Sequence, residues 1–411
     1  MEQLSANIDL LWLYVCSALV FIMQAGFLCL ESGLTRRKNN INVAIKNLAD
    51  FCLTTIVFWL FGFGLMFGLS YQGWAGSSQF LLDFSHKSSF FGAFFIFQVM
   101  FCGAAVTIMS GAIAERMQFS TYLIVTVLIS GLIYPLFGHW AWGGLDTGDA
   151  YGWLNSMGFV DFAGSSVVHS VGGWVSLAVL LIIGPRIGRF SAEGKPQRIY
   201  PSNLPMATFG AVLLFIGWLG FNGGSTLTLN DQVSMIVANT IIAGCVGAVS
   251  AGLLGYVVQN RLNVTQFING CLGGLVAITA NCFAVTTPIA ALIGLVGGMI
   301  VIGIEELLEN LQIDDAVGAI PVHLGAGIWG TLAVGLYGDL AVLGTGLTRI
   351  EQINVQLLGI VVCGLWTFGV TYGVLKVVNL LYPLRVSEEH ELIGLNIAEH
   401  GEREEDEIAL L

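Results

Sequence analysis

Long apolar stretches alternate along the chain with short polar segments. An apolar stretch of about 17–25 residues is long enough to cross a membrane as a helix. Eleven such stretches are predicted, at about 9–30, 47–69, 90–113, 119–140, 162–184, 202–222, 233–258, 265–285, 288–308, 321–338 and 353–380. The eighth is interrupted by Gly, and the tenth by Gly and Pro. The pattern predicts an all-α polytopic membrane protein with eleven transmembrane helices.

Composition agrees with this prediction. Hydrophobic residues make up 55% of the chain and charged residues 10%, and the mean hydropathy is +0.81. Soluble domains carry about 25% charged residues. No basic segment precedes the first apolar stretch, so we interpret it as the first helix rather than a signal peptide. The eight cysteines are scattered through apolar segments without metal-ligand spacing, which favours a packing role.

Basic residues predict the orientation of the helices, because Lys and Arg concentrate in cytoplasmic loops. Of the 15 Lys and Arg residues, only Lys87 and Arg349 fall on one side of the eleven-helix arrangement. The others fall on the opposite side: Arg36, Arg37, Lys38, Lys46, Arg116, Arg186, Arg189, Lys195, Arg198, Arg261, Lys376, Arg385 and Arg403. We therefore expect the N-terminus outside and the C-terminus in the cytoplasm.

Two stretches at the predicted starts of helices five and ten share one pattern. "DFAGSSVVH" (161–169) and "DAVGAIPVH" (315–323) both have Asp eight residues before His and Gly five before it. Eleven helices divide as five, five and one, with repeats at about 9–184 and 202–338 and helix eleven at about 353–380. Because five is odd, the second repeat must run upside down relative to the first. Inverted repeats commonly form a site near the membrane midplane, so we expect His169 and His323 to meet there.

A histidine inside a membrane is costly, which makes it a functional-site candidate. Two facing imidazoles offer donors and acceptors for a narrow polar path or for proton relay. We weigh metal binding as a rival and reject it, since catalytic zinc requires three protein ligands. Asp161 and Asp315 lie about two helical turns from the histidines. Because no nucleophile–base or metal set is evident, we expect neither an enzyme nor a metal or other cofactor.

Aromatic residues gather at the predicted outer ends of helices three, four and six. The stretches "FQVMF", "HWAWGG" and "GWLGFNGGS" supply Phe97, Phe101, Trp140, Trp142, Phe221 and Ser225. Each stretch alone is typical of an interface belt or of packing. Together they are able to form an aromatic cup, and a desolvated cation over such rings gains about 2 kcal/mol or more.

The chain resembles the ammonium transporters of the Amt/Rh family from about residue 10 to about residue 401. The resemblance is carried by "DFAGSSVVH", "GAIPVHLGAGIWG", "GWLGFNGGS", "GAIAERM", "GPRIGRF" and "LRVSEEHELIGLNIAEHGE", in the expected order. It implies the Amt/Rh-type fold with eleven helices, a homotrimer, and one narrow pore through each subunit.

The resemblance also implies roles for individual residues. Trp142 and Ser225, with Phe97 beside them, resemble the outer ammonium-recruitment site. Asp161 resembles the carboxylate beneath that site, and Asp315 is its counterpart by the repeat. Phe101 and Phe221 resemble the phenyl pair that closes the pore, and His169 and His323 the twin histidines. The loop at 143–160 is longer than in compact bacterial members, so Trp153 is an alternative to Trp142.

The resulting expectation is an ammonium transporter of the cell inner membrane, with a membrane domain at 1–382 and an acidic cytoplasmic tail at 383–411. The tail motif suggests docking of a PII-type regulatory protein. A net charge of −12 concentrated in the tail argues against nucleic acid. One alternative is an ammonium sensor, because "SGLTRRKNNINVAIKNLADF" is closer to members fused to a signalling domain. A gas channel of the Rh type fits Trp142 and Ser225 less well.

Overall fold

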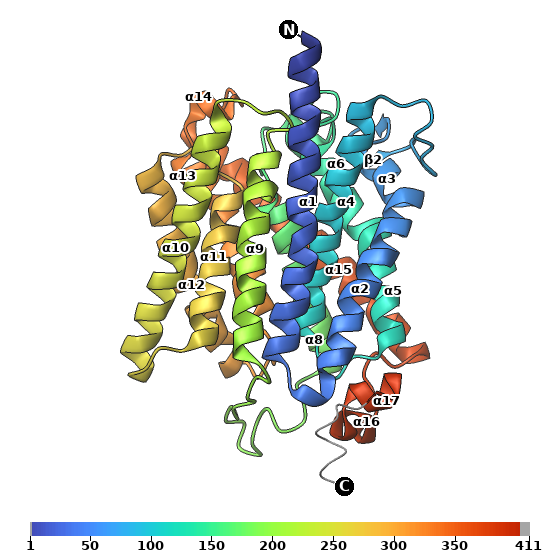
Figure 1. Ribbon diagram of the computed structural model, residues 1–411, viewed down its shortest axis with the longest axis vertical. Coiled ribbons are helices and arrows are strands. Elements are labelled where there is room, and N and C mark those ends of the chain that lie inside the picture. Colours follow the sequence, from blue (N-terminus) through green and yellow to red (C-terminus); the bar gives the residue numbers. More distant parts are fainter. Residues whose placement is uncertain (1, 403–411) are drawn as a thin grey trace.

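Long apolar helices run between the two ends of the molecule, and the start of α1 (Glu2–Leu34) and α17 (Leu395–His400) lie at opposite ends (Figure 1). The structure is a computed structural model and describes residues 2–402. Within that range, ten helices are long and apolar enough to cross a membrane, and Val264–Thr279 is a shorter apolar helix. The protein is thus a multi-pass membrane protein of the predicted helical class. Arg403 and the acidic end of the predicted tail lie outside the described residues.

The elements follow one another in two halves. The first half comprises α1 (Glu2–Leu34), η1 (Arg37–Asn39), α2 (Asn40–Val57), η2 (Phe58–Gly62), α3 (Phe63–Phe67), β1 (Ser70–Tyr71), β2 (Ala75–Gly76), α4 (Ser89–Ala112), α5 (Phe119–Leu128), η3 (Ile129–Ile133), α6 (Tyr134–Trp142), α7 (Trp153–Ser156), η4 (Ser165–Ser170) and α8 (Val171–Ile183). The second comprises α9 (Leu204–Gly224), α10 (Gln232–Gln259), α11 (Val264–Thr279), α12 (Thr287–Asn310), η5 (Ile320–Gly325), α13 (Ala326–Tyr337), α14 (Leu340–Leu343), α15 (Arg349–Leu381), α16 (Glu388–Ile393) and α17 (Leu395–His400). Strands β1 and β2 form a short antiparallel hairpin.

Several predicted spans need correction, and two of them differ at their C-terminal ends. The first was predicted at 9–30, yet α1 continues to Leu34, so residues 31–34 are buried helix rather than loop. The eighth was predicted at 265–285, but α11 ends at Thr279. Its last carbonyls accept hydrogen bonds from the other repeat: Ala163 N donates to Thr279 O (3.2 Å) and Phe162 N to Ala280 O (3.2 Å). Backbone N–H groups of the chain before η4 thus satisfy the carbonyl groups at the end of this shorter helix.

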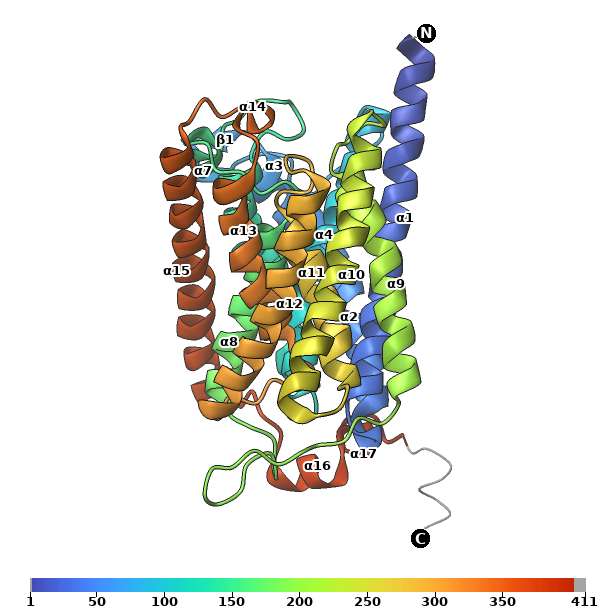
Figure 2. The same ribbon diagram turned by 90° about the vertical axis from the view of Figure 1, so that its left-hand side faces the viewer.

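Helices α1 and α9, the first of each repeat, pack side by side (Figure 2). Their backbones approach so closely that a Cβ on Gly210 would lie 2.3 Å from Leu30 N. On the facing side, a Cβ on Gly33 would lie 2.6 Å from Ala207 N. Small residues permit such contact between membrane helices, where no hydrophobic effect drives association. The abundant glycines thus serve tight packing.

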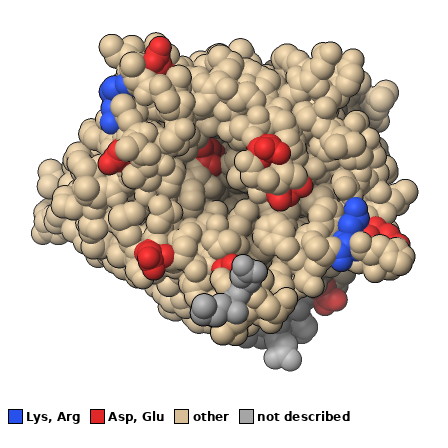
Figure 3. All heavy atoms as spheres, turned by 90° about the horizontal axis from the view of Figure 1, so that it is seen from above, with Lys and Arg blue, Asp and Glu red and all other residues tan. Residues whose placement is uncertain are grey.

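Several basic residues predicted in polar segments are in fact buried. Lys46 lies inside α2 with 0% of its surface exposed, and its Nζ donates to the Met117 carbonyl at 2.8 Å. Helix α2 starts seven residues before the predicted span, because polar residues there find partners in other segments. Arg116, which follows α4, is likewise fully buried. Few Lys or Arg atoms appear on the face that carries the N-terminus, which is hollowed near its middle (Figure 3).

Candidate functional site

A capped turn precedes each of the two histidine-bearing helices. Asp161 is 4% exposed, and its Oδ2 accepts from Ser166 N and Val167 N, both at 2.8 Å. Its Oδ1 accepts from Gly164 N at 3.1 Å. Gly164 has φ +116°, a conformation that favours glycine. The carboxylate therefore accepts hydrogen bonds from backbone N–H groups that have no partner within the first turn of the helix. It thus caps the start of η4.

Asp315 repeats this arrangement in the second half. Its side chain accepts from Gly318 N at 3.0 Å and from Ile320 N at 2.6 Å. Gly318, like Gly164, stands three residues after the Asp and has a positive φ, +84°. The sequence pattern that the two stretches share thus encodes the same capped turn in each half. Because both carboxylates are occupied, neither is a free ligand for the histidines.

The two turns bring the histidines together. His169 lies in η4 and His323 in η5, both of them π-helical turns, which often mark functional sites. The Nδ1 atoms are 3.2 Å apart, and the rings lie nearly parallel with centroids 5.2 Å apart. His169 Nε2 has no hydrogen-bond partner within residues 2–402. The predicted contact between residues 154 positions apart is present.

A stack of aromatic rings lies against the histidines. Phe101 on α4 and Phe221 on α9 have centroids 3.9 Å apart and planes 18° apart. Phe221 is 5.6 Å from the His169 ring, and Phe97 is 4.6 Å from Phe101. Phe97, Phe101 and Phe221 are all buried. The rings therefore form a continuous series that ends on the histidine pair.

Trp142, rather than Trp153, joins this series. Its ring lies 6.1 Å from Phe101 in an edge-to-face arrangement, and its Nε1 donates to the Asp161 carbonyl at 2.6 Å. Trp153 packs instead against Trp74 and Trp140, at 5.5 and 5.8 Å. The long loop thus builds a separate aromatic cluster and leaves Trp142 in place beside Phe101.

Ser225 directly follows α9 as its C-terminal cap, next to the stack, and is partly buried. Its Oγ donates to the Phe221 carbonyl at 2.8 Å. The preceding Gly224 touches Phe97: a Cβ there would lie 2.8 Å from Phe97 Cε2. Because the hydroxyl proton is used internally, the oxygen keeps its lone pairs free to accept from a donor.

Sequence reasoning missed two residues that contact the histidines. Trp218 stacks on His169 with centroids 5.0 Å apart, and its Nε1 donates to Thr279 Oγ1 at 2.8 Å. Phe27 lies 6.1 Å from the His323 ring. Trp218 precedes Phe221 by three residues, so helical spacing alone places both on one face. Phe27 has no comparable signal, since α1 is far from His323 in sequence.

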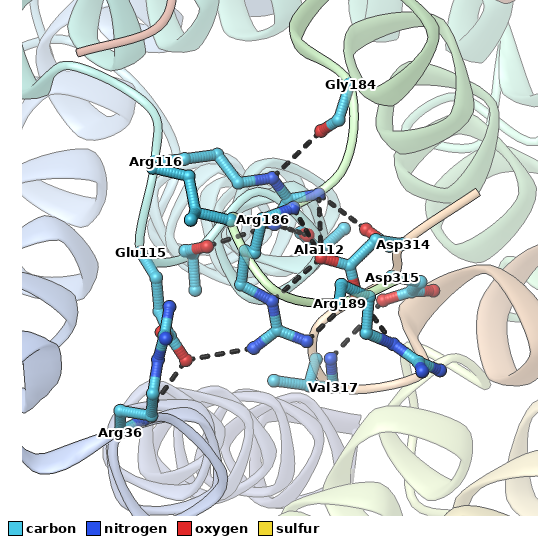
Figure 4. Close-up of polar contacts among 12 residues, drawn as sticks. Arg36, Ala112, Glu115, Arg116, Gly184, Arg186, Arg189, Asp314, Asp315 and Val317 are labelled. Carbon is cyan, nitrogen blue, oxygen red and sulfur yellow. Dashed lines mark hydrogen bonds and ion pairs between the residues drawn. The ribbon is translucent and has the colours of Figure 1, made fainter. Parts of the chain in front are cut away.

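A buried ionic cluster lies in the segments that follow α4, α8 and α12 (Figure 4). Arg186 donates to Asp314 through Nε (2.8 Å) and Nη2 (2.9 Å), and through Nη1 to Glu115 (2.9 Å). Burial alone would raise the pKa of Asp314, but Arg116 and Arg186 hold it below its usual range. Arg186 and Arg36 likewise lower the pKa of Glu115 against the effect of burial. The motifs "GAIAERM" and "GPRIGRF" therefore meet in one cluster.

The segment after α15 is held against this cluster. Glu391 on α16 is 1% exposed and accepts from Ile187 N at 2.7 Å and from Arg385 Nη2 at 2.7 Å. On α17, Glu399 accepts from Phe119 N at 2.9 Å and from Asn42 Nδ2 at 2.8 Å. The described part of the predicted tail is thus docked on the helix ends.

Known proteins share this fold and sequence. Residues 11–405 match the Ammonium Transporter Family. The Synechocystis sp. protein named "Putative ammonium transporter sll0537" is 53% identical over 398 residues, covering 96% of this chain and 73% of its own length. Ammonium transporter Amt2 of Archaeoglobus fulgidus is 40% identical over 422 residues (97% and 88%). A solved structure named "Sensor Amt Protein" superposes with a TM-score of 0.94 at 40% identity (97% and 100%). The Candida albicans Mep2 structure gives 0.84 at 26% identity (93% and 87%).

Proposed function

This chain belongs to the ammonium transporter family, as its motifs predict, and we propose that it captures ammonium, removes its proton and conducts it through a twin-histidine pore. The observation that carries the proposal is the continuous series from Trp142 through Phe101 and Phe221 to His169. The series leads from an aromatic mouth into a path whose polar groups are two imidazoles.

In this proposal the recruitment site binds the ammonium ion. Trp142 and Phe97 present aromatic faces, and such faces attract a cation by about 0.5–2 kcal/mol each. The Ser225 oxygen accepts one N–H bond. Asp161 acts indirectly, because its side chain caps η4 while its backbone carbonyl holds the Trp142 indole.

Beyond this site the cation meets the buried Phe101–Phe221 stack. Desolvation disfavours the charged form of an amine, so ammonium passing the stack gives up its proton. Potassium has no proton to lose and keeps the full cost of desolvation, which many times exceeds what one or two ring contacts return. The same dry passage therefore selects against potassium.

His169 and His323 then bind the ammonia and carry the proton. Each neutral imidazole has one donor and one acceptor nitrogen, so the pair is able to hydrogen-bond ammonia and to pass a proton across the 3.2 Å between the Nδ1 atoms. His169 Nε2, which has no partner within residues 2–402, is available to bind ammonia or a proton.

The test is an ammonium-pulse current on the purified protein in proteoliposomes, with potassium pulses as the selectivity control. A saturable current specific for ammonium is expected. His169→Ala and His323→Ala should each reduce it at least tenfold, whereas His86→Ala, in an exposed loop, should not. Unchanged ammonium flux and selectivity in both pore variants would refute the proposal.

A sensor is the second candidate, favoured by the likeness to the structure named "Sensor Amt Protein". A sensor needs the recruitment site but no conduction. Tight ammonium binding to wild-type protein that gives neither current nor ammonia uptake would support it. The Rh-type gas channel fits less well, because a neutral gas gains nothing from an aromatic site for cations.

Further expectations complete the proposal. We expect a homotrimer with one pore per subunit, located in the inner membrane with the N-terminus outside. The ionic cluster and the docked α16 and α17 would then face the cytoplasm. A PII-type regulatory protein or a signalling domain is the partner expected at this face.

A further inference from the structure

A buried glutamate borders the path on the far side of the histidines. Helix α1 carries Phe27 and Glu31 four residues apart, so both side chains lie on one helix face. Phe27 contacts the His323 ring, with centroids 6.1 Å apart. Glu31 lies one turn further toward the C-terminal end of the molecule and is 1% exposed.

Glu31 and His323 line the same small cavity. The cavity is small, about 10 Å³ measured as the space open to the centre of a water molecule. That is enough for one such molecule. The rest of the wall is mainly apolar, with Phe27, Ile108 and Val317 among its residues, and Glu31 is the one carboxylate among the described residues that form it. His169 is completely buried, whereas His323 keeps 4% of its surface accessible. A single molecule of water or ammonia in this cavity would therefore share a wall with both His323 and Glu31.

The partners of Glu31 are neutral. Its Oε2 accepts from Asn47 Nδ2 at 2.9 Å and from the Ser110 hydroxyl. Within residues 2–402, no Lys or Arg nitrogen lies within ion-pair distance of it. The nearby Lys46 directs its Nζ to the Met117 carbonyl instead.

The other buried acid of this region is differently placed. Asp50 accepts from the Tyr122 hydroxyl and from Thr107 Oγ1, and it does not line the cavity. A carboxylate without a cation is expensive inside a membrane and marks proton pathways. Glu31, open to the cavity and with no Lys or Arg at ion-pair distance within residues 2–402, is the group suited to bind and release a proton there.

We propose that Glu31 receives the transported proton on the inner side of the twin histidines and returns it to ammonia before exit. This inference rests on the proposed function. His323 imidazolium loses its N–H proton to the Glu31 carboxylate through the molecule in the cavity. The resulting carboxylic acid then protonates ammonia, so that ammonium leaves and the carboxylate is restored. One proton and one ammonia enter, and one ammonium ion exits.

The test separates charge movement from ammonia movement in proteoliposomes. Ammonium-pulse current reports charge, and stopped-flow alkalinisation of the lumen under an ammonia gradient reports ammonia conductance. Glu31→Gln should lower the current at least tenfold while ammonia conductance stays within twofold of wild type. Glu31→Asp, which keeps the carboxylate, should recover part of the current. The control Glu305→Gln changes a half-buried glutamate of α12 that bonds Gln266 outside the cavity, and it should alter neither quantity.

Other results would overturn the inference. An unchanged current in Glu31→Gln would show that the proton does not use this residue, while the twin-histidine proposal would stand. An equal fall of current and ammonia conductance, not relieved in Glu31→Asp, would show a role in packing only. Absence of any ammonium-dependent flux in wild-type protein would refute the proposed function itself and this inference with it.

Discussion

Replacing Asp161 by Asn tests whether this carboxylate acts as the cap of the histidine-bearing turn. In the structure Oδ2 accepts two backbone N–H bonds and Oδ1 accepts one. Asn has a single carbonyl oxygen. If that oxygen faces Ser166 and Val167, the amide NH₂ faces the N–H of Gly164, donor against donor.

The structure permits an estimate of the cost. One buried N–H loses its acceptor, which costs about 1–3 kcal/mol. The two remaining bonds lose their charge, and each falls from about 1.5–3 to about 1 kcal/mol. Asp161→Asn should therefore destabilise the protein by about 2–7 kcal/mol. Asp315→Asn should cost a similar amount, because its carboxylate holds the same kind of turn.

Equilibrium unfolding in mixed SDS–detergent micelles, followed by tryptophan fluorescence, measures this loss. The control is Asp231→Asn, since Asp231 precedes α10 without a side-chain cap bond, and it should be indistinguishable from wild type. If Asp161→Asn were as stable as Asp231→Asn, the capping argument would be refuted. If it destabilised while Asp315→Asn did not, the equivalence of the two repeats would be refuted.

Three further predictions follow from other parts of the structure. Trp142→Phe should raise the half-saturating ammonium concentration about fivefold, equivalent to ~1 kcal/mol, in current measurements where Trp153→Phe has no effect; the reverse result would contradict the assignment. The pKa of Asp314 is lowered, so its stabilisation is complete well above its unfolded pKa of about 3.9 and is lost progressively as the pH falls from there toward the folded pKa. Asp314→Asn should flatten the fall in melting temperature between about pH 4 and pH 2, and an unchanged slope there would contradict this. Gly298→Ala places a Cβ 2.3 Å from a carbonyl of α10 and should destabilise by about 1–3 kcal/mol in the same unfolding assay, whereas Gly303→Ala, with open space around it, should not.

The sequence determined features that depend on neighbouring residues. Apolar length predicted the helices that cross the membrane, because each must satisfy its own backbone in lipid. The spacing of Asp161 and Gly164, repeated at Asp315 and Gly318, encodes one capped turn, and such a turn needs only local contacts. Since the turn fixes where the helix begins, it also fixed where each histidine stands, and the repeat predicted that the two would meet.

Tertiary structure decided which polar groups are buried and with what partners. The hydropathy pattern predicted Lys46 in a loop and the end of the first span before Glu31. A charged residue lowers the mean hydropathy of its neighbourhood whether it is buried or exposed. Glu31 is buried because Ser110, 79 residues away, donates to it. The choice between Trp142 and Trp153 likewise depended on which ring reaches Phe101 on another helix. Such contacts join segments distant in the chain, and no local pattern carries them.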